Sequence, residues 1–394
     1  MHNLILKIIY LFLIFIYISM RILRDSMIAF TIGPEGTSIA KFISIFLVLL
    51  FAYIQNKLLK KYCMNQVLKM SCFVFAACLL AIELRVIDNN NFKIPYIPIL
   101  FNKLINNMPV LSFYIVSELF AVFIVTNFWL LCNAIIKNSE KPKKYIYNEL
   151  FSISQIGVLL ASSICLIFKG IPVFIIIGIL LIIPVFVSRL PEFRKKIEKE
   201  KNNYNLAINK NVLIIPTITV ICGMIAGIID PYTKFQLKNI SLNNTVYTNR
   251  LSTILILQAI ISMILGELFK RDFPIKKLLT PFFLIINLTL LMIFKNYSCS
   301  FPFGIACTLT VIGFKALKYS SHSPFKEQFI RKSEFMESIL IFEGISGRIG
   351  KNLIAVLLSL LFSFSLDWFY IQTPMLILSL FLSMFWFILV VALK

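Results

Sequence analysis

Apolar residues in this chain occur in long runs, and short polar stretches separate one run from the next. A helix needs about 20 mainly apolar residues to cross the hydrocarbon core of a bilayer. Runs near that length are found at residues 4–20, 38–56, 66–84, 108–136, 150–168, 171–188, 211–229, 250–268, 277–294, 300–316, 338–364 and 369–393. The pattern therefore predicts an all-α polytopic membrane protein with about twelve transmembrane helices.

The first run begins close to Met1, and no small-residue cleavage site follows it. It continues directly into Arg21 and Arg24. We therefore expect a retained helix and not a cleaved signal peptide.

The longest polar stretch lies between the sixth and seventh runs and is rich in Lys and Arg. It divides the chain into an N-terminal six-helix bundle at residues 1–190, a basic cytoplasmic linker at 191–210 and a C-terminal six-helix bundle at 211–394. Two such bundles suit an alternating-access carrier, because its substrate is held between two bundles that rock around it. The expected architecture is major-facilitator-like.

Composition agrees with a membrane protein, because a chain of 394 residues that is 59% hydrophobic and 14% charged is too apolar for one soluble core. The 39 Lys and Arg outnumber the 18 Asp and Glu, which in a soluble protein would suggest nucleic-acid binding. Here most cations occupy short loops, where they set the orientation in the membrane. We expect no nucleic-acid partner, and we expect both termini and the linker on the cytoplasmic side.

Catalytic and metal chemistry find little support in the sequence. The eight cysteines are scattered without a CxxC pair, and His2 and His322 are the two histidines. The segment EGISGRIGKN is similar to a phosphate-binding loop, but Ile345 replaces the first glycine, Asn352 replaces the Ser or Thr, and no strand precedes it. We expect no enzyme, cofactor or metal, and we interpret these glycines as helix contacts. A membrane enzyme such as a lipid-phosphate transferase is the least favoured class.

Cations next to the apolar runs are candidate functional residues. Arg21, Arg24 and Lys41 flank the first outward connection, and Lys234 follows the seventh run, although cations are expected to be scarce on that side. Basic side chains that snorkel to the interface would explain such positions equally well.

Two carboxylates lie in apolar surroundings. Glu118 has apolar neighbours on both sides, and Asp230 ends the run MIAGIID. Such a carboxylate either locks two helices through a salt bridge or takes part in transport, and both interpretations can hold together.

The stretch KALKYSSHSPFK places Lys315, Lys318 and Lys326 around a Tyr-Ser-Ser cluster at the end of an apolar run. A lysine at bilayer depth costs roughly 2.5–3.5 kcal/mol on insertion scales, so it is rarely placed there without an anion or a carboxylate to meet it. We therefore expect this stretch to bind something negative.

Four blocks of the sequence match the motifs of one family. They are RILRDSMIAFTIGPEGTSIAK, SELFAVFIVTNFWLLCNAIIKNSEKPKKY, IIDPYTKFQLK and FKALKYSSHSPFKE. The matching positions are Arg21, Arg24, Asp25, Lys41, Glu118, Leu119, Phe128, Trp129, Asn133, Glu140, Lys143, Asp230, Lys234, Lys315, Lys318, Tyr319, Ser320, Pro324, Lys326 and Glu327. In order and spacing the chain resembles the nucleotide transporters of plastids, obligate intracellular bacteria and microsporidia, also called non-mitochondrial ADP/ATP translocases.

The resemblance implies exchange of ATP for ADP, and relatives of this type import several nucleotides or NAD. It implies that the transport charges lie at Lys41, Glu118, Asp230 and one lysine of the tenth helix, either Lys326 or Lys318. We expect a monomer in the cell (inner) membrane of an intracellular bacterium or parasite, an origin that the richness in Ile, Lys, Asn and Phe also suggests.

The chain departs from the family pattern at several matched positions. Asp230 replaces a glutamate, Thr233 replaces a tryptophan, and His322 and Ser323 replace a Phe-Asp pair. These changes bear on the choice of substrate and hardly on the fold.

Charge favours the same class of substrate. A nucleoside triphosphate carries about four negative charges and needs several Lys or Arg donors. Carboxylates would pair with these cations in the empty carrier, so that binding exchanges one partner for another. The expected substrate-binding residues are Arg21, Arg24, Lys41, Glu118, Asn133, Asp230, Lys234, Lys315, Lys318 and Lys326. We expect exchange of external ATP for internal ADP, with phosphate as a further candidate substrate; the alternative is an ion-coupled importer of other nucleotides, NAD or another organic anion.

Overall fold

The computed structural model describes most of the chain. The described residues are 2–32, 34–87, 107–137, 143–191, 210–268, 276–296, 300–318, 320, 350–351, 353–355, 357–358, 361 and 368–392. Nearly all of them are helical, and no strand occurs among them. The predicted all-α class is confirmed.

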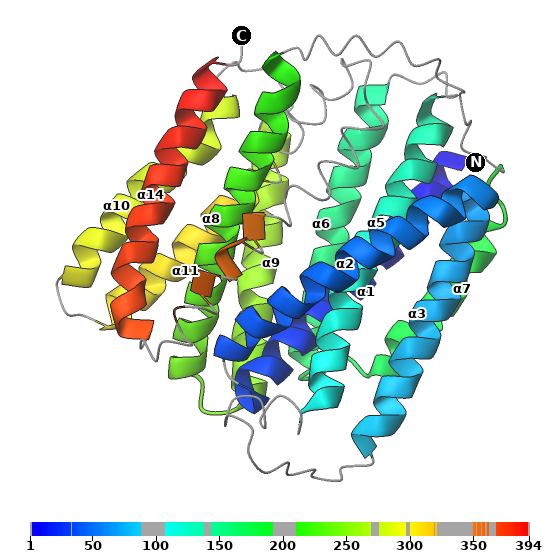
Figure 1. Cartoon of the computed structure of the whole chain (residues 1–394), viewed down its shortest axis with the longest axis horizontal. Coiled ribbons are helices and arrows are strands. Elements are labelled where there is room, and N and C mark those ends of the chain that lie inside the picture. Colours follow the sequence, from blue (N-terminus) through cyan, green and yellow to red (C-terminus); the bar gives the residue numbers. More distant parts are fainter. Residues whose placement is uncertain are drawn as a thin grey trace. The chain divides into compact units, whose positions relative to one another are not determined.

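The helices follow one another in the order that the apolar runs predict (Figure 1). They are α1 (His2–Thr31), α2 (Pro34–Lys61), α3 (Met64–Ile87), α5 (Met108–Lys137), α6 (Lys143–Ile167), α7 (Val173–Val187), α8 (Lys210–Ile240), α9 (Asn244–Leu268), α10 (Lys276–Asn296), α11 (Ser300–Leu317) and α14 (Trp368–Ala392). Six of these helices are long and apolar enough to cross a membrane by themselves. Most of the predicted run at 338–364 lies outside the described residues.

Several helices are longer than the predicted apolar runs, and α1 and α8 extend furthest beyond their predicted ends. The predicted ends were at residues 20 and 229, but α1 continues to Thr31 and α8 continues to Ile240. Arg21, Arg24 and Lys234 therefore lie inside helices and not beyond their ends, whereas Lys41 lies inside α2, within the predicted run at 38–56. Charged residues end an apolar run in the sequence, whereas a helix continues as long as its backbone bonds are made.

The chain divides into two compact units. Unit 1 comprises Met1–Tyr204 and Leu242–Thr253, and unit 2 comprises Asn205–Ser241 and Ile254–Lys394. The first part of α9 thus groups with unit 1. The boundaries expected from the sequence, 1–190, 191–210 and 211–394, stay a prediction.

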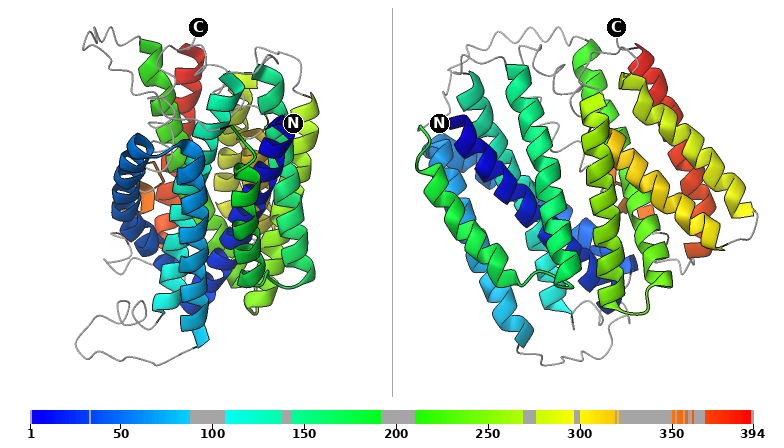
Figure 2. Two further views of the ribbon diagram at one scale, coloured as in Figure 1. Left: turned by 90° about the vertical axis from the view of Figure 1, so that its right-hand side faces the viewer. Right: turned by 180° about the vertical axis from the view of Figure 1, so that it is seen from behind.

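In unit 1, α1 packs against α2, α5, α6 and α7, while α5 also contacts α2 and α3. The view from behind in Figure 2 shows α1 running obliquely against α6. Gly157 on α6 permits this contact, because a Cβ there would lie 3.0 Å from Cγ2 of Ile14. Asn65 at the start of α3 donates from Nδ2 to the carbonyls of Leu190 and Pro191, at 3.3 and 3.1 Å, and so ties α3 to the end of α7.

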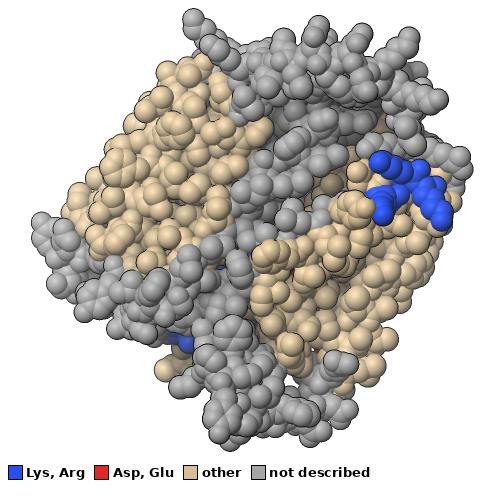
Figure 3. All heavy atoms as spheres, viewed as in Figure 1, with Lys and Arg blue, Asp and Glu red and all other residues tan. Residues whose placement is uncertain are grey.

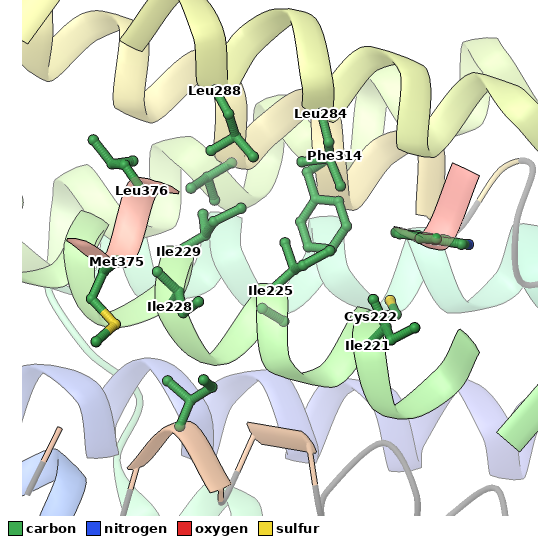
Figure 4. Packing of buried hydrophobic residues seen from close by; sticks show 14 of the residues in the cluster. Ile221, Cys222, Ile225, Ile228, Ile229, Leu284, Leu288, Phe314, Met375 and Leu376 are labelled. Carbon is green, nitrogen blue, oxygen red and sulfur yellow. The ribbon is translucent and has the colours of Figure 1, made fainter. Parts of the chain in front are cut away.

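In unit 2, α8 packs against α11 and α14, and α10 packs against the same two helices. Their shared core includes Ile225, Leu284, Phe314 and Met375 (Figure 4). Gly350 comes so close to α8 that an added Cβ would overlap the carbonyl oxygen of Val220. The interpretation of this glycine as a helix contact is confirmed.

The two units share one pattern of helix contacts. The pairs α1 with α5, α3 with α5, α3 with α7 and α1 with α7 in unit 1 correspond to α8 with α11, α10 with α11, α10 with α14 and α8 with α14 in unit 2. The first and fourth helices of each unit are therefore equivalent neighbours. Two halves related in this way are typical of major-facilitator carriers.

Candidate functional site

Arg24 on α1 is the centre of a buried polar cluster in unit 1. Its Nε donates to Oδ1 of Asp25 at 3.0 Å, and its Nη1 donates to Oε1 of Glu118 at 2.5 Å. The same Nη1 lies 3.2 Å from Oγ of Ser117, and the guanidinium carbon lies 4.6 Å from the ring centre of Tyr114. The cluster therefore joins α1 to α5 through one planar cation that is held on several sides.

Helical spacing assembles this cluster from separate parts of the sequence. Tyr114 and Glu118 are four residues apart on α5, so they share a face of that helix. Arg21 and Asp25 have the same spacing on α1, and Arg21 Nε lies 3.7 Å from Oδ2 of Asp25. Arg24 is 5% exposed and Asp25 is 1% exposed, so opposite charges meet here away from solvent.

A second ion pair joins α8 to α11 in unit 2. Nζ of Lys315 lies 2.8 Å from Oδ1 of Asp230, and both side chains are 13% exposed. Lys234 is buried one turn beyond Asp230, and Lys318 follows three residues beyond Lys315. One further lysine thus lies within about one turn of each partner, Lys234 beyond Asp230 and Lys318 beyond Lys315.

Both pairs are costly to break. Removing one partner of a buried ion pair leaves an uncompensated charge, which destabilises a protein by about 3–5 kcal/mol. An incoming anion can take the place of a carboxylate and keep the cation paired, provided that solvent or a proton compensates the released carboxylate. The arrangement can therefore exchange a bound carboxylate for an anionic ligand.

The structure places the predicted site residues in two groups. Arg21, Arg24 and Glu118 come together in unit 1, and Asp230 and Lys315 pair in unit 2. Lys41 is half-buried on α2, Lys234 and Lys318 lie near the second pair in sequence, and the side chain of Asn133 and all of Lys326 lie outside the described residues.

Sequence reasoning did not include three members of the first cluster among the site residues. They are Asp25, Tyr114 and Ser117. Tyr114 is fully buried, and its hydroxyl has no hydrogen-bond partner among the described residues. The spacing of Tyr114 to Glu118 was a signal in the sequence, but an apolar run rich in aromatic residues hides a single functional ring.

Metal ligands do not gather in the described part of the chain. No group of three or more His, Cys, Asp or Glu side chains that could hold a metal ion occurs there.

No family model and no curated protein sequence matches this chain. Solved structures match it over nearly its full length. The nucleoside transporter NupG, in a point-mutant form, is 13% identical, with a TM-score of 0.63 over 100% of both chains. A D-xylose-proton symporter is 9% identical, with a TM-score of 0.68 over 98% of this chain and 96% of that one. A bacterial homologue of the iron transporter ferroportin is 11% identical, with a TM-score of 0.64 over 100% of this chain and 99% of that one.

These similarities establish the fold. The chain has the major-facilitator-like architecture that its apolar runs predicted. It is an integral membrane protein with the fold of a helical transporter.

Proposed function

We propose that this protein is a membrane antiporter that exchanges external ATP for internal ADP by alternating access. The observation that carries the proposal is that two partly buried ion pairs, Arg24 with Glu118 and Lys315 with Asp230, lie on equivalent helices of the two units. A polyanion that enters can displace the carboxylates from the cations, and the carboxylates can return when it leaves.

Exchange, and not net uptake, follows from the energy of the empty site. An empty carrier must turn over with its charges paired inside each unit, and a loaded carrier turns over with the anion as partner. If the empty form turns over slowly, a second substrate must bind on the side where the first one was released before the carrier can return. The motif resemblance supports nucleotides as the anion, as does the structural neighbour named as a nucleoside transporter.

The alternative is an ion-coupled importer of other nucleotides, NAD or another organic anion. The side chain of Glu118 is about one quarter exposed, so a proton can reach its carboxylate. One structural neighbour is named as a proton symporter. A protonated Glu118 would give up its ion pair with Arg24 without any substrate, while Asp25 still holds the guanidinium. Proton coupling would then replace exchange.

Proteoliposomes separate the two mechanisms. Labelled ATP, ADP, GTP and NAD are offered in turn to vesicles that hold ADP or no nucleotide. We expect rapid ATP uptake into ADP-loaded vesicles and uptake near zero into empty ones. Equal uptake into both would contradict exchange and support the importer.

The membrane potential gives a second readout. Exchange of ATP, with about four negative charges, for ADP, with about three, moves one negative charge inward, and 100 mV acts on it with about 2.3 kcal/mol. A potassium gradient with valinomycin that makes the lumen positive should therefore accelerate ATP uptake. Lys315→Gln should abolish the uptake, whereas Lys169→Gln, on the exposed connection between α6 and α7, serves as the matched control.

A further inference from the structure

One face of α2 is exposed along its whole second half. Phe46, Leu50 and Tyr53 are 62%, 52% and 58% exposed, and their spacing of four and three places them on one side of the helix. The opposite side is buried, since Gln55 donates to Oδ1 of Asn127 on α5 at 2.8 Å. The exposed side therefore points away from the neighbouring helix of its own unit.

The same face ends in three exposed lysines. Lys57, Lys60 and Lys61 continue the spacing of four and three at the end of α2, and Figure 3 shows basic side chains gathered there in blue. We call these three residues the α2 basic end. The face is thus apolar for about two turns and then cationic.

The α2 basic end carries positive charge that the described residues do not neutralise by an ion pair. The sequence has no Asp or Glu between Glu35 and Glu83. Nζ of Lys57 lies 4.7 Å from the ring centre of Tyr53, and Nζ of Lys61 lies 5.4 Å from that of Tyr62. The helix C-terminus contributes only about half a negative charge, so three ammonium groups outweigh it.

We propose that the α2 basic end binds the phosphate headgroup of an anionic phospholipid, whose acyl chains lie along Phe46, Leu50 and Tyr53. Only an amphiphile uses both parts of the face, because a soluble anion would leave the apolar part uncovered. Tyr53 stands at the border between the two parts, where aromatic rings are favoured at membrane interfaces. The predicted topology puts this end of α2 at the cytoplasmic leaflet, which is rich in anionic lipid.

The test uses the full-length protein purified in detergent and titrated with phosphatidylglycerol, followed by native mass spectrometry. Each lysine near an anionic surface contributes about fivefold in affinity, so Lys57→Gln, Lys60→Gln and Lys61→Gln together should weaken binding about a hundredfold. The same three residues changed to Arg keep the charge and should bind as the wild type does. Lys60→Gln alone should lose about fivefold, and Lys169→Gln should lose nothing.

Two further binding measurements identify the kind of molecule that the α2 basic end binds. Phosphatidylcholine should bind at least tenfold more weakly than phosphatidylglycerol to the wild type, and equally to the triple Gln variant. Inorganic phosphate in millimolar excess should not displace phosphatidylglycerol. Wild-type affinity in the triple Gln variant, or full displacement by phosphate, would overturn the proposal, the second result in favour of a soluble anion.

Discussion

The partly buried ion pairs of the two units differ in which helix carries the cation and in how the cation is held. In unit 1 the first helix supplies the cation Arg24 and the fourth helix supplies Glu118. In unit 2 the first helix supplies the anion Asp230 and the fourth helix supplies Lys315. Equivalent helices therefore carry opposite charges, although they make the same helix contacts.

The two cations are also held differently. The side chain of Arg24 is 6% exposed. Its guanidinium contacts Asp25, Ser117, Glu118 and the ring of Tyr114. The side chain of Lys315 is 13% exposed and ends in a compact ammonium on a flexible stem. The difference indicates that Arg24 is held rigidly in unit 1, whereas Lys315 makes an adaptable contact in unit 2.

The largest expected effect on stability comes from removing the guanidinium of Arg24. Arg24→Ala leaves Asp25 and Glu118 with a buried negative charge, so we expect the free energy of unfolding to fall by about 3–5 kcal/mol. Lys315→Ala should cost less, because it takes the cation from one described carboxylate and not from two. Thermal unfolding in detergent measures both, and a larger loss for Lys315→Ala would reverse the assignment of the rigid unit.

Exchange of the two charges within a pair sharpens the comparison. The double variant Asp230→Lys/Lys315→Asp keeps an ion pair and should retain at least a tenth of wild-type ATP uptake. The corresponding variant Arg24→Glu/Glu118→Arg places Glu next to Asp25, and we expect uptake about a hundredfold lower than wild type, which corresponds to about 2.7 kcal/mol. Similar uptake by the two double variants, at equal amounts in the membrane, would contradict the difference between the rigidly held Arg24 and the adaptable Lys315.

Close helix contacts give a third test. Gly350→Ala should destabilise the protein by about 1–3 kcal/mol, because its Cβ would meet backbone atoms of α8 that cannot move aside. At Gly157 the nearest atoms belong mainly to the side chain of Ile14, which can shift by a few tenths of an ångström. We therefore expect Gly157→Ala to cost less than Gly350→Ala in thermal unfolding, and the opposite order would contradict the described contacts.

The smallest effect concerns the ring of Tyr114. Tyr114→Phe keeps the ring over Arg24 and removes a hydroxyl that has no hydrogen-bond partner among the described residues, so stability should change by less than about 0.5 kcal/mol. Tyr114→Leu removes the cation–π contact and should cost about 2 kcal/mol. Equal stability of the two variants would show that the ring contributes by volume alone.

Periodicity predicted the helices well and their ends less well. Apolar runs located α5, α10 and α11 to within a few residues, because uninterrupted apolar residues there coincide with the helix itself. In α1 and α8 the run stopped at charged or polar residues, and Pro231 added a second apparent end inside α8. A helix tolerates both when neighbouring helices provide partners for the polar groups.

The sequence also identified charged residues without their pairing. Glu118 and Asp230 stood out because carboxylates are rare in apolar surroundings, but nothing local tells which cation each one meets. That choice depends on the packing of α1 on α5 and of α8 on α11, which joins residues about ninety positions apart. Ser117 and Tyr114 escaped notice for the same reason, since their role arises only when Arg24 lies against them.

The opposite signs of the two ion pairs bear on the history of the chain. If both halves descend from one ancestral bundle, one half had to reverse the order of its charges. No single substitution can do this, because the intermediate would bury two like charges, at a cost of several kcal/mol. A path through uncharged residues at both positions avoids that intermediate. Any alignment of the halves by residue identity would then score low at the residues of these two ion pairs.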